Sequence, residues 1–104
     1  MLGEFEQVVM LGVLRVGDDA YAVTIHDEIH RQTGRDVAIG AIYKTLARLE
    51  EKGLLRSRNG EPTAERGGRR KRYYLVSAAG KRAVQQSLAT ITRLAAGLEL
   101  GLDS

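Results

Sequence analysis

The amphipathic segment over residues 39–52, followed by Gly53, is the feature that most constrains the fold of this chain. Its apolar residues recur at steps of four and three, which places them on one face of a helix: Ile42, Leu46 and Leu49. Its cations fall off that face: Lys44, Arg48 and Lys52. Gly53 suits a left-handed C-cap, which only glycine adopts cheaply. The segment therefore predicts a helix with one buried and one basic stripe that ends at this glycine.

A β-hairpin is predicted directly after this helix. Leu54 to Arg58 has the pattern of a short strand and Arg72 to Ser77 that of its partner, with Tyr73 and Leu75 sharing one face. The intervening residues 59–68 are turn formers and polar groups that cannot bury a core. They are typical of a wing, which we expect to become ordered with a ligand.

Two further helices are predicted before residue 39. Residues 4–16 hold more apolar side chains than one stripe needs, so this helix should be covered on more than one side. The next runs from about Ala20 to Gln32, with Asp19 placed to cap it. Its apolar face holds Tyr21, Ile25 and Ile29. The connection from Gly34 to Ala38 is short, as a helix-turn-helix requires.

A final helix is predicted to begin after Ser77, whose hydroxyl can cap it. Its apolar residues alternate at steps of four and three in a heptad seam: Val84, Leu88, Ile91, Ala95, Leu98 and Leu102, supplemented by Leu94. Together with the surplus apolar side chains of the first helix, this seam predicts a homodimer. The predicted dimerisation residues are Phe5, Val9, Val84, Leu88, Ile91, Leu94, Ala95 and Leu98. The alternative is that the last helix packs only on the first helix of its own chain.

The sequence thus predicts a mainly α fold with a small β-hairpin (α+β), a winged helix-turn-helix with an added C-terminal dimerisation helix. We expect the winged helix-turn-helix domain over residues 1–77 and the dimerisation helix, packed on the N-terminal helix, over residues 78–104. A chain of 104 residues with 43% hydrophobic content can bury one modest core.

Positive charge is concentrated in the middle of the chain. Residues 31–72 hold twelve Lys or Arg against five Asp or Glu, a net of +7, whereas the rest of the chain carries a net of −4. Such a patch attracts a polyanion, and release of counterions makes the binding strongly salt-dependent. The alternative interpretation is a solvated surface.

Six short motifs occur in order along the chain. The most specific are the Gly-x-x-Tyr segment of a predicted helix and the basic segment of the wing that ends in two tyrosines. The motifs are Leu11-Gly12-Val13-Leu14, Ala20-Tyr21-Ala22-Val23, Gly40-Ala41-Ile42-Tyr43, Leu46 to Leu54, Arg70-Lys71-Arg72-Tyr73-Tyr74 and Ser77 to Lys81. With them the chain resembles the PadR family of bacterial transcriptional regulators. Ala20, Ala38 and Lys44 stand where the family more often has glycine, serine and proline. The resemblance implies a dimeric repressor whose third helix enters the major groove, whose wings touch flanking backbone and whose last helix forms the dimer.

The predicted reading helix and wing supply the candidate DNA contacts: Gly40, Ala41, Tyr43, Lys44, Arg48, Arg66, Arg69, Arg70, Lys71 and Arg72. Lys44 and Arg48 share one helix face, and an arginine bound to both acceptors of a guanine adds roughly 1 to 3 kcal/mol of discrimination. Three alternatives stay open. Tyr43 could lie at the edge of the core, Gly40 could serve only the turn, and Arg48 could pair with Glu50 or Glu51.

The predicted partner is double-stranded DNA with an inverted-repeat operator, bound by a homodimer. Regulation by a small apolar or aromatic effector is expected where the first and last helices of the two subunits meet. Leu94, Ile91, Phe5 and Val9 could line such a cavity, although they are equally good core residues.

Other classes of function fit the sequence less well. His26-Asp27-Glu28-Ile29-His30 places two histidines four apart on a helix, but aspartate replaces the glutamate that a zinc protease needs as general base, and a third histidine is lacking. One Arg-Gly-Gly unit, Arg66 to Gly68, is weak support for RNA binding. The chain has no cysteine, and Glu4 and Glu6 stand where a secretory signal would carry cations. We therefore expect a cytoplasmic protein that is not an enzyme, with no cofactor or metal and without a membrane span.

Overall fold

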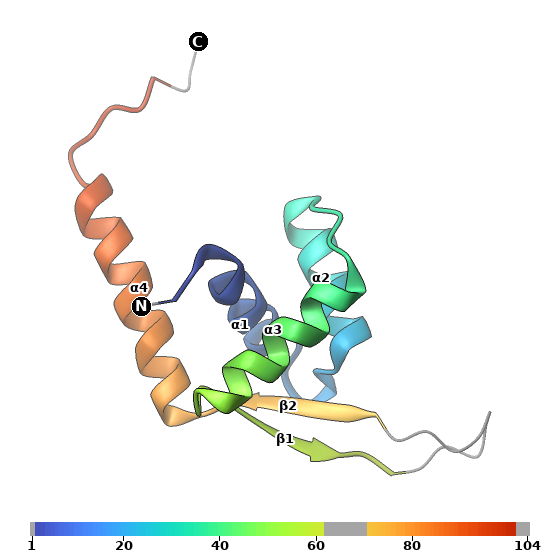
Figure 1. Cartoon of the computed structure of the whole chain (residues 1–104). Coiled ribbons are helices and arrows are strands. Elements are labelled where there is room, and N and C mark those ends of the chain that lie inside the picture. The colour runs from blue at the N-terminus through green and yellow to red at the C-terminus, as the bar shows by residue number, and fades with distance from the viewer. Residues whose placement is uncertain (1, 62–70, 102–104) are drawn as a thin grey trace.

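The computed structural model describes residues 2–61 and 71–101. Within these ranges the protein contains four α-helices, one 3₁₀ turn and one two-stranded antiparallel sheet. In chain order the elements are α1 (Glu4–Val16), η1 (Gly17–Asp19), α2 (Ala22–Thr33), α3 (Ile39–Glu51), β1 (Leu55–Asn59), β2 (Arg72–Val76) and α4 (Ala78–Ala95). Figure 1 shows α1 at the centre, with α2 and α3 to one side, α4 to the other and the hairpin below. The mainly helical fold with a small hairpin is confirmed.

The core lies where α1 meets the other elements. Residues of α1 contact α2, α3, α4 and β2. The largest fully buried side chains come from α1, α2, α3 and β1: Val9, Met10, Ile25, Ile42, Leu46, Leu49 and Leu55. Val76 of β2 and Val84 of α4 extend the same cluster. Because burial of one such side chain contributes about 1.5 to 3 kcal/mol, this cluster holds the three-helix layer and the hairpin together.

The second strand of the hairpin is bonded to the connection between α1 and α2. Leu55 pairs with Val76 and Arg58 with Tyr73, and the Tyr74 backbone N–H donates to the Ala20 carbonyl at 2.8 Å. That bond lies just before α2, so the connection between the first two helices borders the sheet. The hairpin therefore extends from the helix-turn-helix in a fixed direction, as Figure 1 shows.

Two glycines shape the chain around α3 and α4. Gly53 has φ of 75°, and the Leu54 N–H donates to the Leu49 carbonyl at 3.0 Å, which confirms the predicted left-handed end of α3. Gly80 lies in the first turn of α4, where an added Cβ would stand 2.1 Å from the Leu54 carbonyl oxygen. The first turn of α4 therefore packs directly on the chain that leaves α3. The predicted Ser77 cap is present, since its hydroxyl accepts from the Gly80 N–H at 3.0 Å.

Two predictions about helix ends were wrong. Asp19 lies in η1 and does not cap α2; instead, Thr24 Oγ1 accepts from the Tyr21 N–H at 3.0 Å and donates to the Asp19 carbonyl at 2.5 Å. The last helix ends at Ala95 rather than continuing, and Gly97 beyond it has φ of 80°. Leu98 is therefore outside the helix.

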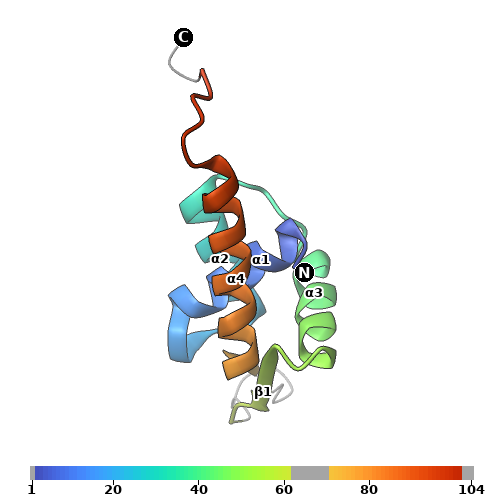
Figure 2. The ribbon, with the colours of Figure 1, turned by 90° about the vertical axis from the view of Figure 1, so that its left-hand side faces the viewer.

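Helix α4 leaves the core as it proceeds. Gly80, Val84 and Ser87 are its buried residues, and every described residue from Leu88 onward is exposed. Figure 2 shows the end of α4 and the segment after it extending past the other helices. In the part of the chain that the structure describes, no helix is long and apolar enough to span a membrane.

Candidate nucleic-acid interface

The outward face of α3 is the most prominent candidate binding surface. Tyr43 is 56% exposed, and Lys44 and Arg48 are exposed beside it. The opposite face is closed, since Ile42 and Leu46 are fully buried in the core. Because the buried face fixes the helix, the cations and the tyrosine hydroxyl are presented to solvent from a rigid support.

The start of α3 leaves room for close approach of a ligand. Gly40 is exposed, and a Cβ added there would meet nothing within 4 Å, so packing within the chain does not require glycine. Ala41 next to it is half-buried. The predicted alternative, a glycine needed only by the interhelical turn, therefore has no support in the packing around Gly40.

Two histidines of α2 hold the turn that precedes α3. The His26 Nε2 atom lies 2.8 Å from the Val37 carbonyl oxygen, and His30 Nδ1 lies 3.3 Å from that of Arg35. With a carbonyl as acceptor, each nitrogen acts as the donor. Among the described residues no group of three or more His, Asp or Glu could hold a metal ion. The two histidines, four positions apart, therefore both contact the segment that leads into α3.

Glu6 of α1 fastens the other end of α3. Its carboxylate accepts a bond from Lys52 Nζ at 2.8 Å and another from the Gly3 backbone N–H at 3.0 Å. The bond from Lys52, followed by that from Gly3, lowers the pKa of Glu6 below its ordinary value. The carboxylate is therefore held in its charged form where α1 meets the C-terminal end of α3.

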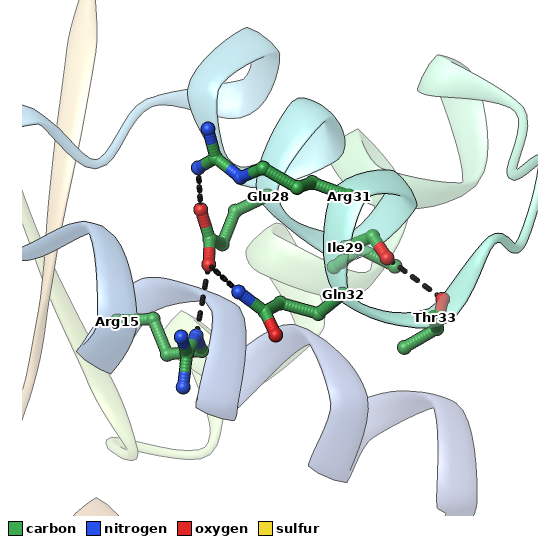
Figure 3. Close-up of polar contacts among 6 residues, drawn as sticks. All are labelled: Arg15, Glu28, Ile29, Arg31, Gln32 and Thr33. Carbon is green, nitrogen blue, oxygen red and sulfur yellow. Dashed lines mark hydrogen bonds and ion pairs between the residues drawn. The ribbon is translucent and has the colours of Figure 1, made fainter.

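A buried carboxylate also joins α1 to α2. Glu28 is 6% exposed and accepts from Arg15 Nε at 2.8 Å and from Gln32 Nε2 at 3.0 Å. Arg31 donates to its second oxygen. Figure 3 shows these three donors converging on Glu28. Since the carboxylate is both paired and hydrogen-bonded, its burial is compensated and α2 is locked in position behind α3.

Polar bonds link α3 to both strands of the hairpin. Glu50 accepts a hydrogen bond from the Ser57 hydroxyl at 2.5 Å, and Ser57 accepts one from Arg72 Nε at 3.0 Å. Glu50, one of two carboxylates that could have paired with Arg48, is thus engaged with the hairpin. Between α3 and β2 lies a shallow hollow lined by Lys44, Ala47, Arg48, Glu50, Glu51, Arg72 and Tyr74. Burial, the largest effect on Tyr74, raises the pKa of its phenol.

Of the five wing cations predicted to contact DNA, the structure describes two, Lys71 and Arg72. Both are exposed at the start of β2. The other predicted wing contacts, Arg66, Arg69 and Arg70, lie outside the described residues. The hairpin and α3 therefore place Arg72 beside Lys44 and Arg48 along one hollow.

The predicted dimerisation residues divide into three groups by exposure. Leu88, Ile91, Leu94, Ala95 and Leu98 are exposed. Val9 and Val84, at 0% and 4% exposure, belong to the core of the single chain, so they are not available on its surface. Phe5 is half-buried, and the Arg35 guanidinium lies 5.9 Å from its ring centroid. The exposed members of the predicted set thus lie on the distal part of α4 and on the segment after it.

Three helices, a braced turn and a hairpin beside an exposed basic helix define a winged helix-turn-helix protein. The sequence matches the transcriptional regulator PadR-like family over residues 10–86, and the chain belongs to that family. Members of this family are transcription regulators rather than enzymes. The search of curated proteins found no match.

Solved structures show the same fold. A transcriptional regulator from Clostridium thermocellum is 21% identical with a TM-score of 0.72, covering 86% of this chain and 84% of that one. A PadR-like transcription factor from Bacteroides fragilis is 25% identical with a TM-score of 0.71, covering 86% and 82%. Bacillus subtilis PadR, solved in complex with operator DNA, is 22% identical with a TM-score of 0.65, covering 82% of this chain and 47% of that one.

Sequence reasoning missed most of the residues that position the site. Glu6 and Lys52 are 46 positions apart, and Ser57 and Arg72 are 15 apart. No local pattern indicates such pairs. The spacing of His26 and His30 in the sequence indicates that they share one helix face. It does not indicate that they contact the carbonyl groups of Val37 and Arg35.

Proposed function

We propose that this regulator binds double-stranded DNA sequence-specifically as a homodimer and represses transcription. The observation that carries the proposal is the exposed face of α3, where Tyr43, Lys44 and Arg48 stand over a fully buried apolar face. This arrangement suits a helix that enters the major groove, because the cations can reach both phosphates and base edges. Arg72 and Lys71 extend the positive surface toward the wing.

A two-fold pair of such chains would suit an inverted repeat. Recognition helices that read successive major grooves on one side of B-DNA lie about 34 to 36 Å apart. Support comes from Bacillus subtilis PadR, which was solved with operator DNA. In this arrangement the predicted wing cations Arg66, Arg69 and Arg70 contact flanking phosphates or a narrow minor groove.

The DNA proposal is tested by selecting bound fragments from random duplexes and scoring the symmetry of the recovered sequences. We expect a palindromic consensus, with affinity that falls steeply as salt rises. A winged helix used only for protein contacts is the alternative, and it would recover no consensus. Such a result would refute operator binding.

We propose that α4 forms the dimer. The supporting observation is that Leu88, Ile91 and Leu94 are 42%, 53% and 73% exposed on one side of the helix. Ile91→Glu with Leu94→Glu should yield monomers with unchanged helix content by circular dichroism, since neither side chain is in the core. Ala89→Glu, at an exposed position on the opposite side of the helix, is the control. Dimers of the double variant in sedimentation would place the interface elsewhere.

An effector that releases DNA is the last part of the proposal. A hollow between the N-terminal segment, the end of α3 and α4 is lined by Leu2, Lys52, Leu54, Ala83, Gln86, Ser87 and Thr90. It differs from the predicted effector cavity, since Phe5, Val9, Ile91 and Leu94 are not among its lining residues. It connects the reading helix to the proposed dimer helix and mixes apolar with polar groups. The fluorescent aromatic probe 8-anilinonaphthalene-1-sulfonate should bind there and weaken DNA binding, and Ala83→Leu should reduce both effects. Unchanged DNA affinity with saturating probe would contradict release by this class of molecule.

A further inference from the structure

Four side chains at the base of the hairpin form a continuous stack. The rings of Tyr21 and Tyr73 meet edge to face, with centroids 5.5 Å apart and planes at 75°. The Arg58 guanidinium lies 4.7 Å from the Tyr73 centroid, and the Lys71 ammonium lies 4.4 Å from that of Tyr21. Both cations are within the range of a cation–π interaction. The order through space is therefore Arg58, Tyr73, Tyr21, Lys71.

The backbone of the hairpin is fitted to this stack. The Gly60 N–H donates to the Lys71 carbonyl at 2.7 Å, just beyond the last strand pair. A Cβ added at Gly60 would stand 2.5 Å from Cε2 of Tyr73, so the ring lies directly against the chain as it enters the wing. Lys71 Nζ also donates to the Tyr21 hydroxyl at 3.3 Å, and this bond is the largest cause of the raised pKa of Lys71.

Tyr21 is the only member of the stack that does not belong to the hairpin. It immediately precedes α2, and α2 packs against α3. The ring therefore connects the wing base to the helix that braces the reading helix. Tyr21 is half-buried and is not among the residues of the apolar core, so the fold does not depend mainly on this contact.

We propose that Tyr21 is a positioning residue for DNA binding, which holds Tyr73 and the cations Arg58 and Lys71 at a fixed place relative to α3. The inference rests on the proposed function, because it concerns the wing as a DNA contact. Long cationic side chains lose conformational freedom when they bind, and a side chain already held over a ring loses less. The stack thus pre-organises the positive charge at the wing base.

The first test compares Tyr21→Leu, Tyr21→Phe and the control Leu75→Thr, which alters an exposed residue of β2 that is not part of the stack. Tyr21→Leu should weaken binding of the selected operator roughly five- to tenfold, the factor that corresponds to one aromatic and one cation–π contact. The slope of log affinity against log salt should fall by about 1, as for one lost phosphate contact. Tyr21→Phe keeps the ring and should lie between this variant and wild type. Leu75→Thr should match wild type.

The second test is a double-mutant cycle between Tyr21 and Tyr73. If Tyr21 acts through Tyr73, the variant with Tyr21→Leu and Tyr73→Leu should bind no more weakly than the weaker single variant. Additive losses would show that Tyr21 does not act through Tyr73, and would overturn the proposal that Tyr21 holds Tyr73 and Arg58 in place. A salt slope equal to that of wild type in both Tyr21 variants would also overturn it.

Three outcomes separate this inference from the function on which it rests. Wild-type protein that selects no duplex refutes the proposed function. Wild-type binding that Tyr21→Leu leaves intact refutes only the role of the stack. If Tyr21→Leu lowers the unfolding midpoint, Tyr21→Phe, which removes one hydroxyl, decides the question. Tyr21→Phe should unfold at the same midpoint as wild type but bind the operator more weakly. An operator affinity equal to that of wild type would refute the role of Tyr21.

Discussion

Helices α3 and α4 are both amphipathic, but they stand in opposite relations to the core. The apolar face of α3 is closed, with Ile42, Leu46 and Leu49 at 0% exposure. α4 buries only its first turns, and exposure along its apolar side rises from 4% at Val84 to 73% at Leu94. The surface left on α3 is therefore cationic with one tyrosine, whereas the surface left on the distal half of α4 is apolar.

This difference shows which exposed surface is stable in water without a partner and which gains free energy when it is covered. An exposed lysine or arginine is stable in water, so α3 needs no partner to hold its shape. Covering one leucine or isoleucine contributes about 1.5 to 3 kcal/mol, so the distal half of α4 gains free energy when an apolar surface covers it. A charged ligand therefore suits α3, and a second copy suits α4.

The largest expected effect separates the two helices directly. Leu46→Ala beneath α3 should lower the free energy of unfolding by about 2 to 5 kcal/mol, because it opens a cavity in the core. Leu94→Ala on α4 should change monomer stability by less than about 0.5 kcal/mol, since that side chain is exposed. Urea denaturation at a concentration where the chain is monomeric measures both. If the two variants lost similar amounts of unfolding free energy, the contrast between α3 and α4 would be wrong.

A smaller effect is expected at the carboxylate that fixes α2 behind α3. Glu28→Ala removes the acceptor of three side-chain donors and should destabilise the fold by about 1 to 3 kcal/mol. The control is Glu99→Ala, beyond the end of α4, where the residue is exposed and the unfolding midpoint should not move. An equal midpoint for the Glu28 variant and wild type would show that this cluster does not hold the helices.

Acid should weaken the contact between α1 and α3 in a predictable direction. The pKa of Glu6 is lowered in the folded protein, so its contribution is present above the ordinary value of 4.5 and is lost as pH falls through the folded pKa. Glu6→Gln should therefore cost about 1 kcal/mol near neutral pH and less below pH 4. Unfolding curves of both proteins across this range measure the difference. A difference that grows in acid would contradict the assigned sign.

Effects of about the same size or smaller are expected at the turn before α3. His26→Ala should cost about 1 kcal/mol through loss of the bond to the Val37 carbonyl, and His30→Ala should cost less because its contact to Arg35 is longer. Zinc should change neither unfolding midpoint. A zinc-dependent midpoint in wild type that His26→Ala abolishes would instead support a metal site.

The sequence was informative where the signal is local. Periodicity predicted the buried face of α3, Gly53 predicted its end, and Ser77 predicted the start of α4. The end of α4 is predicted wrongly because the heptad pattern continues to Leu98 and to Leu102, which lies outside the described residues, whereas the helix ends at Ala95 and Gly97 adopts a positive φ. A repeat of apolar residues indicates a shared face only as far as the backbone remains helical.

The candidate site was predicted only in part. The cations on α3 could be named because their spacing alone places them off the apolar face. Val9 and Val84 were assigned to the dimer surface, yet they are core residues, since periodicity cannot tell which apolar side chains the chain itself covers. The stack of Tyr21 on Tyr73 joins positions 52 residues apart, and only the folded chain brings them together.

The central claim is that the exposed face of α3 reads DNA. Its most direct test is fluorescence anisotropy with a selected operator and a random duplex. The test compares two double variants: one carries Lys44→Ala and Arg48→Ala, and the other carries Arg82→Ala and Arg93→Ala. Each pair removes two positive charges, but the second pair lies on exposed positions of α4. The α3 pair should lose at least about tenfold in affinity and its preference for the operator, because one arginine–guanine contact is worth roughly 1 to 3 kcal/mol. Equal losses in the two pairs, with the preference intact, would contradict the account.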